Sequence, residues 1–171
     1  QIETVMRKLF ILLVLTLVLF SCGTSKYTPE EKAAREAKRT QKVIEAINNQ
    51  KFIIDMDYVY PKRFRSRHLD FNYSLEVRGD SVISYLPYYG TAYSVPYGGG
   101  KALNFSAPMS SYRAYQVKNN RMRVELSAKS EEDTYYFILD VYDNGNTNVD
   151  VSSQHRESIG FSGTMQINDE K

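Results

Sequence analysis

The spacing of apolar residues divides the chain into three parts. Residues 9–20 form an apolar run that is interrupted only by Thr16. Residues 29–50 are mostly polar, with a narrow apolar stripe at three- and four-residue spacing, which predicts a helix. From Phe52 onward, apolar and polar residues alternate, which predicts strands that are buried on one face.

The expected helix has a clear start. Thr28 is a good cap, Pro29 fits the first helical position, and Glu31 completes a capping box. The first half of the helix is dominated by charged residues, so we expect it to be solvated. Val43 and Ile47 lie in the second half, which we expect to dock against the rest of the domain.

Nine alternating segments follow the helix, joined by short turns. They are Phe52–Tyr60, Phe71–Val77, Val82–Leu86, Leu103–Ala107, Arg113–Lys118, Met122–Ala128, Tyr135–Tyr142, Thr147–Ser152 and Phe161–Ile167. Gly79-Asp80 and Asn144-Gly145 are typical of hairpin turns between such segments. We therefore predict an all-β domain over residues 51–171, a single antiparallel curved sheet or barrel of about nine strands behind the N-terminal helix. A two-sheet β-sandwich and an α+β arrangement are the alternatives.

The apolar run near the N-terminus is typical of a secretion signal, because twelve residues are too few to span a bilayer comfortably. The run ends at Cys22, and this ending resembles a bacterial lipobox, in which cleavage precedes a cysteine that then carries lipid. We predict a signal peptide over residues 1–21 and a lipidated tether over residues 22–28. Within the signal peptide, residues 1–5 are expected to be extra residues ahead of a start at Met6.

Composition narrows the function classes. Cys22 is the single cysteine, so no disulfide is expected and the fold depends on its core. Without residues 1–21 the chain keeps 20 basic and 19 acidic residues, and this near-neutral balance argues against a nucleic-acid partner. About 150 residues remain, which is enough for one domain.

The sequence offers little catalytic chemistry. His68 and His155 are the two histidines and lie far apart, and neither has the spacing of a zinc ligand set. Asp55 and Asp57 share one strand face and could do acid–base work, but we interpret them as the solvated face of a strand. We therefore predict that the protein is not an enzyme and that it uses no metal or cofactor.

Two segments are candidate binding sites. Residues 85–100 carry five of the 14 tyrosines, and these five are Tyr85, Tyr88, Tyr89, Tyr93 and Tyr97. They can line a ligand site, or they can pack a corner between two strands. The segment at residues 62–68 is strongly basic, and Arg63, Arg65 and Arg67 are candidate anion-binding residues, with a solvated loop as the alternative.

Several short motifs resemble one family. They are Tyr73-Ser74-Leu75, Gly79-Asp80, Tyr85-Leu86-Pro87-Tyr88-Tyr89-Gly90, Ala92-Tyr93, Pro96-Tyr97-Gly98 and Leu103-Asn104-Phe105. Together they are similar to the signature of Bacteroidetes lipoproteins called domain of unknown function 4251. The resemblance covers most of the chain after about residue 40. It implies an envelope protein, and it implies no activity because none is assigned to the family.

That origin bears on location and modification. Residues 23–26 contain no acidic residue of the kind that commonly follows the lipidated cysteine of surface-exported lipoproteins in this phylum. We therefore expect an outer-membrane lipoprotein that faces the periplasm. Asp80-Ser81-Val82 resembles the O-glycosylation sequon of the phylum, which makes Ser81 a candidate glycosylation site.

The sequence thus predicts a non-catalytic envelope lipoprotein that binds a small amphiphile or glycan through its tyrosine-rich loop. The alternative is a structural or protein-docking lipoprotein of the outer membrane. The expected partners are the membrane, through the lipid on Cys22, and a glycan, a lipid or an envelope protein.

Overall fold

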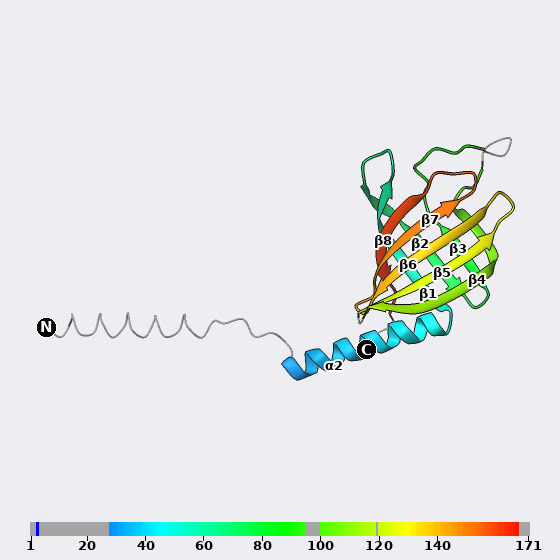
Figure 1. Ribbon diagram of the computed structural model, residues 1–171. Helices are drawn as coiled ribbons and strands as arrows, with labels where there is room; N and C mark the ends of the chain where they lie inside the picture. Colours follow the sequence, from blue (N-terminus) through cyan, green and yellow to red (C-terminus); the bar gives the residue numbers. More distant parts are fainter. Residues whose placement is uncertain (1–2, 4–27, 95–99, 119, 168–171) are drawn as a thin grey trace. The chain divides into compact units, whose positions relative to one another are not determined.

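Eight antiparallel strands form a closed barrel in which each strand pairs with the next along the chain and β8 pairs with β1 (Figure 1). The computed structural model describes residues 3, 28–94, 100–118 and 120–167. Its elements are α2 (Pro29–Asn48), β1 (Lys51–Pro61), β2 (Arg67–Arg78), β3 (Ser81–Tyr85), β4 (Asn104–Lys118), β5 (Arg121–Lys129), β6 (Thr134–Tyr142), β7 (Asn146–Ser153) and β8 (Ile159–Met165). Apart from Glu3, the predicted signal peptide lies outside the described residues, as do Cys22 and Tyr97.

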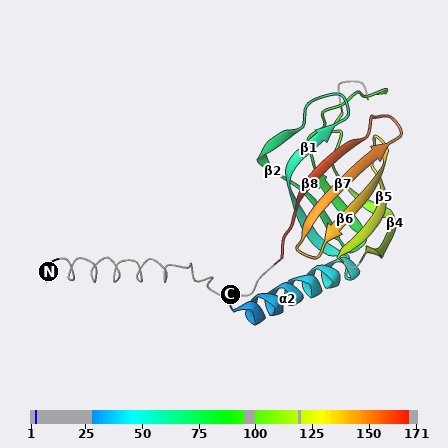
Figure 2. The ribbon, with the colours of Figure 1, turned by 60° about the vertical axis from the view of Figure 1, so that its left-hand side comes forward.

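The closed order confirms the predicted antiparallel barrel and not the two-sheet sandwich or the α+β arrangement (Figure 2). The strand count is eight because two expected strands, Leu103–Ala107 and Arg113–Lys118, are one long strand, β4. The prediction broke the strand near Pro108, which has no N–H to donate. Proline is tolerated here because residues 104–108 of β4 pair with β3 alone.

The chain divides into two compact units, residues 1–34 and 35–171. In the first unit, the capping box forms as expected, since Thr28 N donates to Glu31 Oε2 at 2.9 Å and Glu31 N donates to Thr28 Oγ1 at 3.3 Å. In the second unit, Val43 and Ile47 of α2 are buried, and Tyr112 of β4 donates a hydrogen bond to the Ile47 carbonyl at 2.7 Å. In the described part of the chain, no helix has the length and apolar character needed to cross a membrane.

Alternation along the strands fills the barrel with apolar side chains. In β6, Tyr135, Phe137 and Leu139 are fully buried, while Tyr136 and Ile138 face outward and are 47% and 41% exposed. The other strands contribute inward aliphatic residues in the same way. The barrel interior is therefore a packed core, which directs attention to its ends and its outer surface.

The turns at the two ends of the barrel differ in length. One end carries tight turns, including the predicted Gly79-Asp80 turn, where Gly79 has a φ of 62° that glycine adopts without strain. The other end, which we call the loop end, carries the connections at residues 62–66, 86–103, 130–133 and 154–158. The candidate segments of the sequence lie at the loop end or next to it.

Candidate functional site

The tyrosine-rich loop, residues 86–103, is fastened to the other turns of the loop end. Ala92 forms a β-bridge with Arg156, and the Tyr93 N–H donates to the His155 carbonyl at 2.8 Å. Further along the loop, Tyr135 Oη donates to the Ala102 carbonyl at 2.8 Å. The described parts of the loop are therefore held in place near its middle, at residues 92 and 93, and near its second end, at residue 102.

A buried ion pair lies beneath the loop. Arg156 is 5% exposed, and its guanidinium lies 3.0 Å from Glu132 Oε2 and 3.9 Å from Asp133 Oδ2. Asp133 also accepts backbone hydrogen bonds from Thr134, Gln154 and His155. These bonds satisfy a carboxylate whose side chain is fully buried, so this cluster joins three turns and is structural in character.

The ionisation of this cluster follows its contacts. Burial raises the pKa of Glu132, but hydrogen bonds from the Lys101 N–H and the Arg156 guanidinium outweigh it and hold that pKa below its usual range. Burial raises the pKa of Tyr135 to about 12. Both groups therefore keep a single charge state at neutral pH and stay out of acid–base exchange there.

The five candidate tyrosines do not form one site. The Tyr88 hydroxyl is directed into the protein, where its one hydrogen is shared between the carbonyl oxygens of Thr91 and Glu157, each 2.9 Å from Oη. Tyr93 is 66% exposed beside the turn at residues 154–158, and Tyr97 lies outside the described residues. Tyr85 and Tyr89 lie nearer to β2, each in contact with a residue of that strand.

Tyr85 belongs to an exposed aromatic cluster that it forms with Phe71 and Tyr73. The ring centroids of Tyr73 and Tyr85 are 5.4 Å apart, and Phe71 packs edge-on against Tyr73 at 6.1 Å. Phe71 is 71% exposed and Tyr85 is 47% exposed, so the rings contact each other and also face solvent. Burial raises the pKa of Tyr73, and the neighbouring hydroxyls of Tyr89 and Tyr85 raise it further.

Sequence reasoning missed Phe71 and Tyr73 as site residues, because a bulge puts them there. Met56 pairs with Tyr73 and Tyr58 pairs with His68, so β2 advances five residues while β1 advances two. The extra residues bend β2 outward. Phe71 is therefore exposed, although in a regular strand it would point inward like Leu75, which lies four residues further along. An available signal was the run of aromatic residues Phe71-Asn72-Tyr73 beside the polar Asp70.

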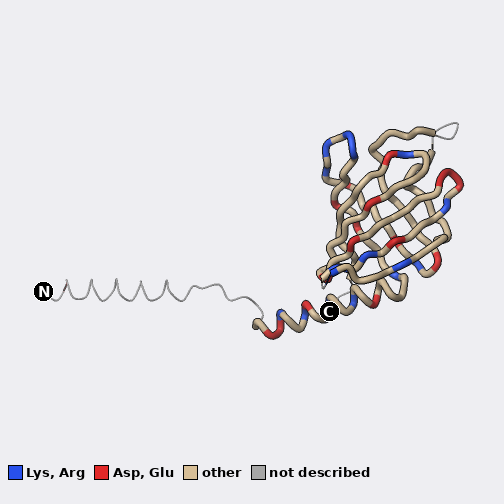
Figure 3. The backbone as a smooth tube through the Cα atoms, viewed as in Figure 1, with Lys and Arg blue, Asp and Glu red and all other residues tan. Residues whose placement is uncertain are grey.

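The three candidate anion-binding arginines also separate. Lys and Arg gather on the turn between β1 and β2 (Figure 3). Arg63 pairs with Glu157 at 3.1 Å, while the Arg67 guanidinium lies 4.5 Å from the centroid of the Tyr89 ring. Arg65 is exposed and has no hydrogen bond or ion pair among the described residues. Arg67 thus lies on β2, the strand that also carries Phe71 and Tyr73, with its guanidinium over the Tyr89 ring.

The remaining candidate residues are isolated. Ser81 follows the tight turn at one end of the barrel, and its Oγ donates to Asp80 Oδ1 at 2.9 Å. His68 Nδ1 lies 3.5 Å from Asp70 Oδ1, and His155 contributes backbone groups to the loop end. Within the described ranges, no three side chains of His, Cys, Asp or Glu are grouped as metal ligands.

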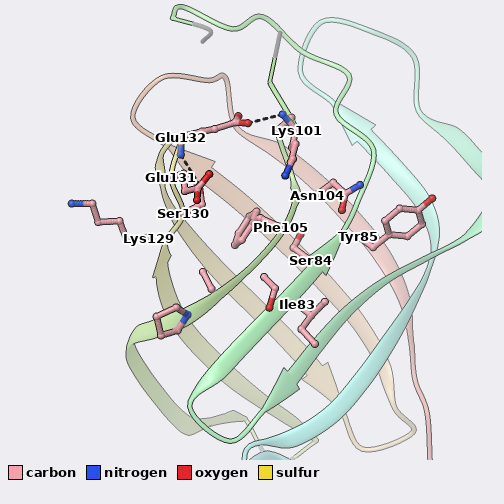
Figure 4. Close-up of a pocket in the computed structure, with 14 residues that line it drawn as sticks. Ile83, Ser84, Tyr85, Lys101, Asn104, Phe105, Lys129, Ser130, Glu131 and Glu132 are labelled. Atoms are coloured by element: carbon pink, nitrogen blue, oxygen red, sulfur yellow. Dashed lines mark hydrogen bonds between the residues drawn. The ribbon is translucent and has the colours of Figure 1, made fainter. Parts of the chain in front are cut away.

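A groove of about 780 Å³ opens on the other side of β3 and β4. Residues 104–108 of β4 and residues 83–85 of β3 line one side, and residues 129–132, at the end of β5 and in the turn that follows it, line the other. Figure 4 shows the Phe105 ring in this groove and the Tyr85 ring pointing away from it. Tyr85 still belongs to the rim of the groove, so the groove and the aromatic cluster adjoin at this residue.

The fold and these surfaces define a small antiparallel β-barrel whose loop end is covered by a fastened tyrosine-rich loop, with an aromatic cluster outside it. The family model described as Domain of unknown function (DUF4251) matches residues 34–165. The chain belongs to this family, as its motifs predicted. Among solved structures, it is similar to the crystal structure of a DUF4251 family protein from Bacteroides eggerthii, with a TM-score of 0.58, 14% identity, and coverage of 77% of this chain and 89% of that chain. No curated protein matches the chain.

Proposed function

We propose that this protein is a non-catalytic binding lipoprotein of the cell envelope, which holds a small amphiphile or glycan at the aromatic cluster. In this proposal, a lipid on Cys22 anchors it to the outer membrane on the periplasmic side. The observation that carries the binding proposal is the cluster itself. Phe71, Tyr73 and Tyr85 pack against one another and still present 71% of Phe71 and 47% of Tyr85 to solvent.

The chemistry of these side chains suits such ligands. Aromatic rings offer large apolar faces that stack on the C–H faces of sugars or on acyl chains, and tyrosine adds a polar tip. Because ring–ring contacts already fix the positions of the rings, little side-chain entropy is lost on binding. Arg67, stacked on Tyr89, supplies a cation at the edge of the surface, which favours ligands with an acidic group.

The alternative is a structural or protein-docking lipoprotein. It is supported by the hydrogen bonds that hold the tyrosine-rich loop in place. The Tyr88 hydroxyl bonds to two backbone carbonyls of the protein and is therefore not available to a ligand. Under this alternative the tyrosines close the barrel end, and the exposed rings meet a partner protein.

Binding assays on matched variants separate these functions. Full-length protein is titrated with oligosaccharides, neutral and acidic, and with short-chain amphiphiles. A Phe71→Ala/Tyr85→Ala double variant is expected to weaken binding by roughly tenfold or more, given about 1–3 kcal/mol for a stacked ring. Tyr136→Ala is the control, because Tyr136 has the same 47% exposure as Tyr85 but lies on β6. Equal affinities for the two variants would assign the aromatic cluster a structural role.

A further inference from the structure

Among the described residues, no strand pairs with residues 104–108 of β4 on the side toward β5. β3 pairs with residues 104–108 of β4. β5 pairs with β4 only from Met109 onward, where Met109 opposes Ala128. The groove of about 780 Å³ lies along this half-paired part of β4, and all of residues 104–108 line it (Figure 4).

Hydrogen bonds at the two ends of this segment fix the direction of its backbone groups. Met109 N donates to the Asp80 carbonyl at 2.7 Å, and Leu86 N donates to the Leu103 carbonyl at 3.2 Å. Residues 103 and 109 therefore face β3. In an antiparallel strand, alternate residues direct their N–H and C=O to the same side. Residues 105 and 107 thus also face β3, and the three residues between these positions face the groove.

The groove-facing residues are Asn104, Ser106 and Pro108. The Asn104 N–H already donates to the Lys101 carbonyl at 2.9 Å, which leaves its C=O open. Ser106 presents both its N–H and its C=O, and Pro108 presents only a C=O because proline has no N–H. The edge therefore offers one donor and three acceptors to a neighbouring strand.

We propose that this edge binds an extended segment of another protein by strand addition. Such a segment would run along β4 for about 17 Å at roughly 3.4 Å per residue. It must supply three N–H groups at alternating positions, so none of these positions is proline. The positions between them face Phe105 and Ala107, so they carry apolar side chains.

The same edge is poorly suited to pairing with a second copy of this chain. In a symmetric pair centred on Ser106, Asn104 of one copy would oppose Pro108 of the other. Pro108 has no N–H for the Asn104 carbonyl, and the Asn104 N–H is already used. Only the two Ser106 hydrogen bonds would form, so the edge is guarded against self-association while it stays open to a different chain.

The proposal is tested with a peptide that can bind the edge through backbone hydrogen bonds and with a control peptide that cannot form them. The probe is a short acetylated peptide of alternating valine and threonine, and its control is the same peptide N-methylated at alternate amides. NMR on the full chain follows the Ser106 amide. The first peptide is expected to shift its resonance and slow its hydrogen exchange, whereas the methylated peptide is expected to do neither. No change at Ser106 with saturating peptide, or equal binding of both peptides, would overturn the proposal.

Two variants isolate the single donor. Ser106→Pro removes the groove-facing N–H without removing a hydrogen bond to β3, and it is expected to weaken peptide binding about tenfold. Ser106→Ala keeps the N–H and is expected to bind like the wild type, so a hydroxyl effect is excluded. If sedimentation showed instead that the wild-type chain self-associates and Ser106→Pro prevents it, the occupant would be a second copy and the proposal would be wrong. The two tests follow different residues, the Ser106 amide here and the rings of Phe71 and Tyr85 at the aromatic cluster, so the failure of one proposal can be told from the failure of the other.

Discussion

Replacing Arg156 by methionine should be among the most damaging single changes in the barrel. Methionine keeps much of the unbranched apolar stem of arginine and removes the charge. Arg156 is the cation between Glu132 and Asp133, and its side chain is only 4% exposed. The change therefore leaves both carboxylates without a positively charged partner.

The two carboxylates respond differently, and this sets the magnitude. The Glu132 side chain is 18% exposed, so part of its charge can be solvated after Arg156 is lost. The Asp133 side chain has no exposed surface and stays buried with three backbone donors and no cation. Breaking a buried pair by removing one partner costs roughly 3–5 kcal/mol of unfolding free energy. We expect a loss in this range, with most of it due to Asp133.

Urea unfolding monitored by circular dichroism measures this loss directly. Arg113→Met is the matched control, because the Arg113 side chain is 71% exposed and pairs with Glu125 at 3.2 Å. An exposed pair contributes about 0–1 kcal/mol, so Arg113→Met should unfold close to the wild type. If Arg156→Met also unfolded within about 1 kcal/mol of the wild type, the buried pair would not hold the loop end together.

Further predictions concern the fold and the modified residues. Gly163→Ala should destabilise the barrel by at least about 1–3 kcal/mol, because a Cβ at this position would overlap the facing backbone of β1. Gly160→Ala is the control in the same unfolding assay, since a Cβ there meets only ordinary van der Waals contacts. The free energy of unfolding should fall between about pH 10 and pH 12, because burial raises the pKa of Tyr135 to about 12 while the unfolded tyrosine ionises near 10. The stabilisation is complete below pH 10 and is lost as the pH rises through this window. Unchanged urea midpoints across the window would contradict the prediction. Cys22→Ala should abolish metabolic labelling with palmitate and release the protein from membranes, and retention of the label would place the lipid elsewhere. An intact mass equal to polypeptide plus lipid would exclude glycosylation at Ser81.

The local pattern of the sequence predicted most of the strands, since alternation in segments such as Met122–Ala128 and the Gly79-Asp80 turn are local features. Closure of the barrel was not predictable in the same way. It depends on pairing β1 with β8, where Ile54 opposes Met165, and no local signal marks a pair so distant in sequence. The barrel and the sandwich therefore stayed alternatives until the register was known.

The candidate site was predictable only in part, for a similar reason. Tyr85 and Tyr89 stood out because tyrosine is concentrated in that segment. Phe71 and Tyr73 were assigned to a regular strand, and only the bulge in β2 brings them out beside Tyr85. The inward turn of Tyr88 depends on the Glu157 carbonyl, which belongs to a distant turn.

Ring-specific NMR tests the proposed binding site most directly. Protein labelled with ¹³C on its phenylalanine and tyrosine rings is titrated with glycans and amphiphiles extracted from native envelopes. Binding at the aromatic cluster predicts saturable shifts of the Phe71, Tyr73 and Tyr85 rings, with no change at Tyr136, which is as exposed as Tyr85. Shifts confined to other rings, or shifts at Tyr136 as large as those at Tyr85, would contradict binding at the aromatic cluster.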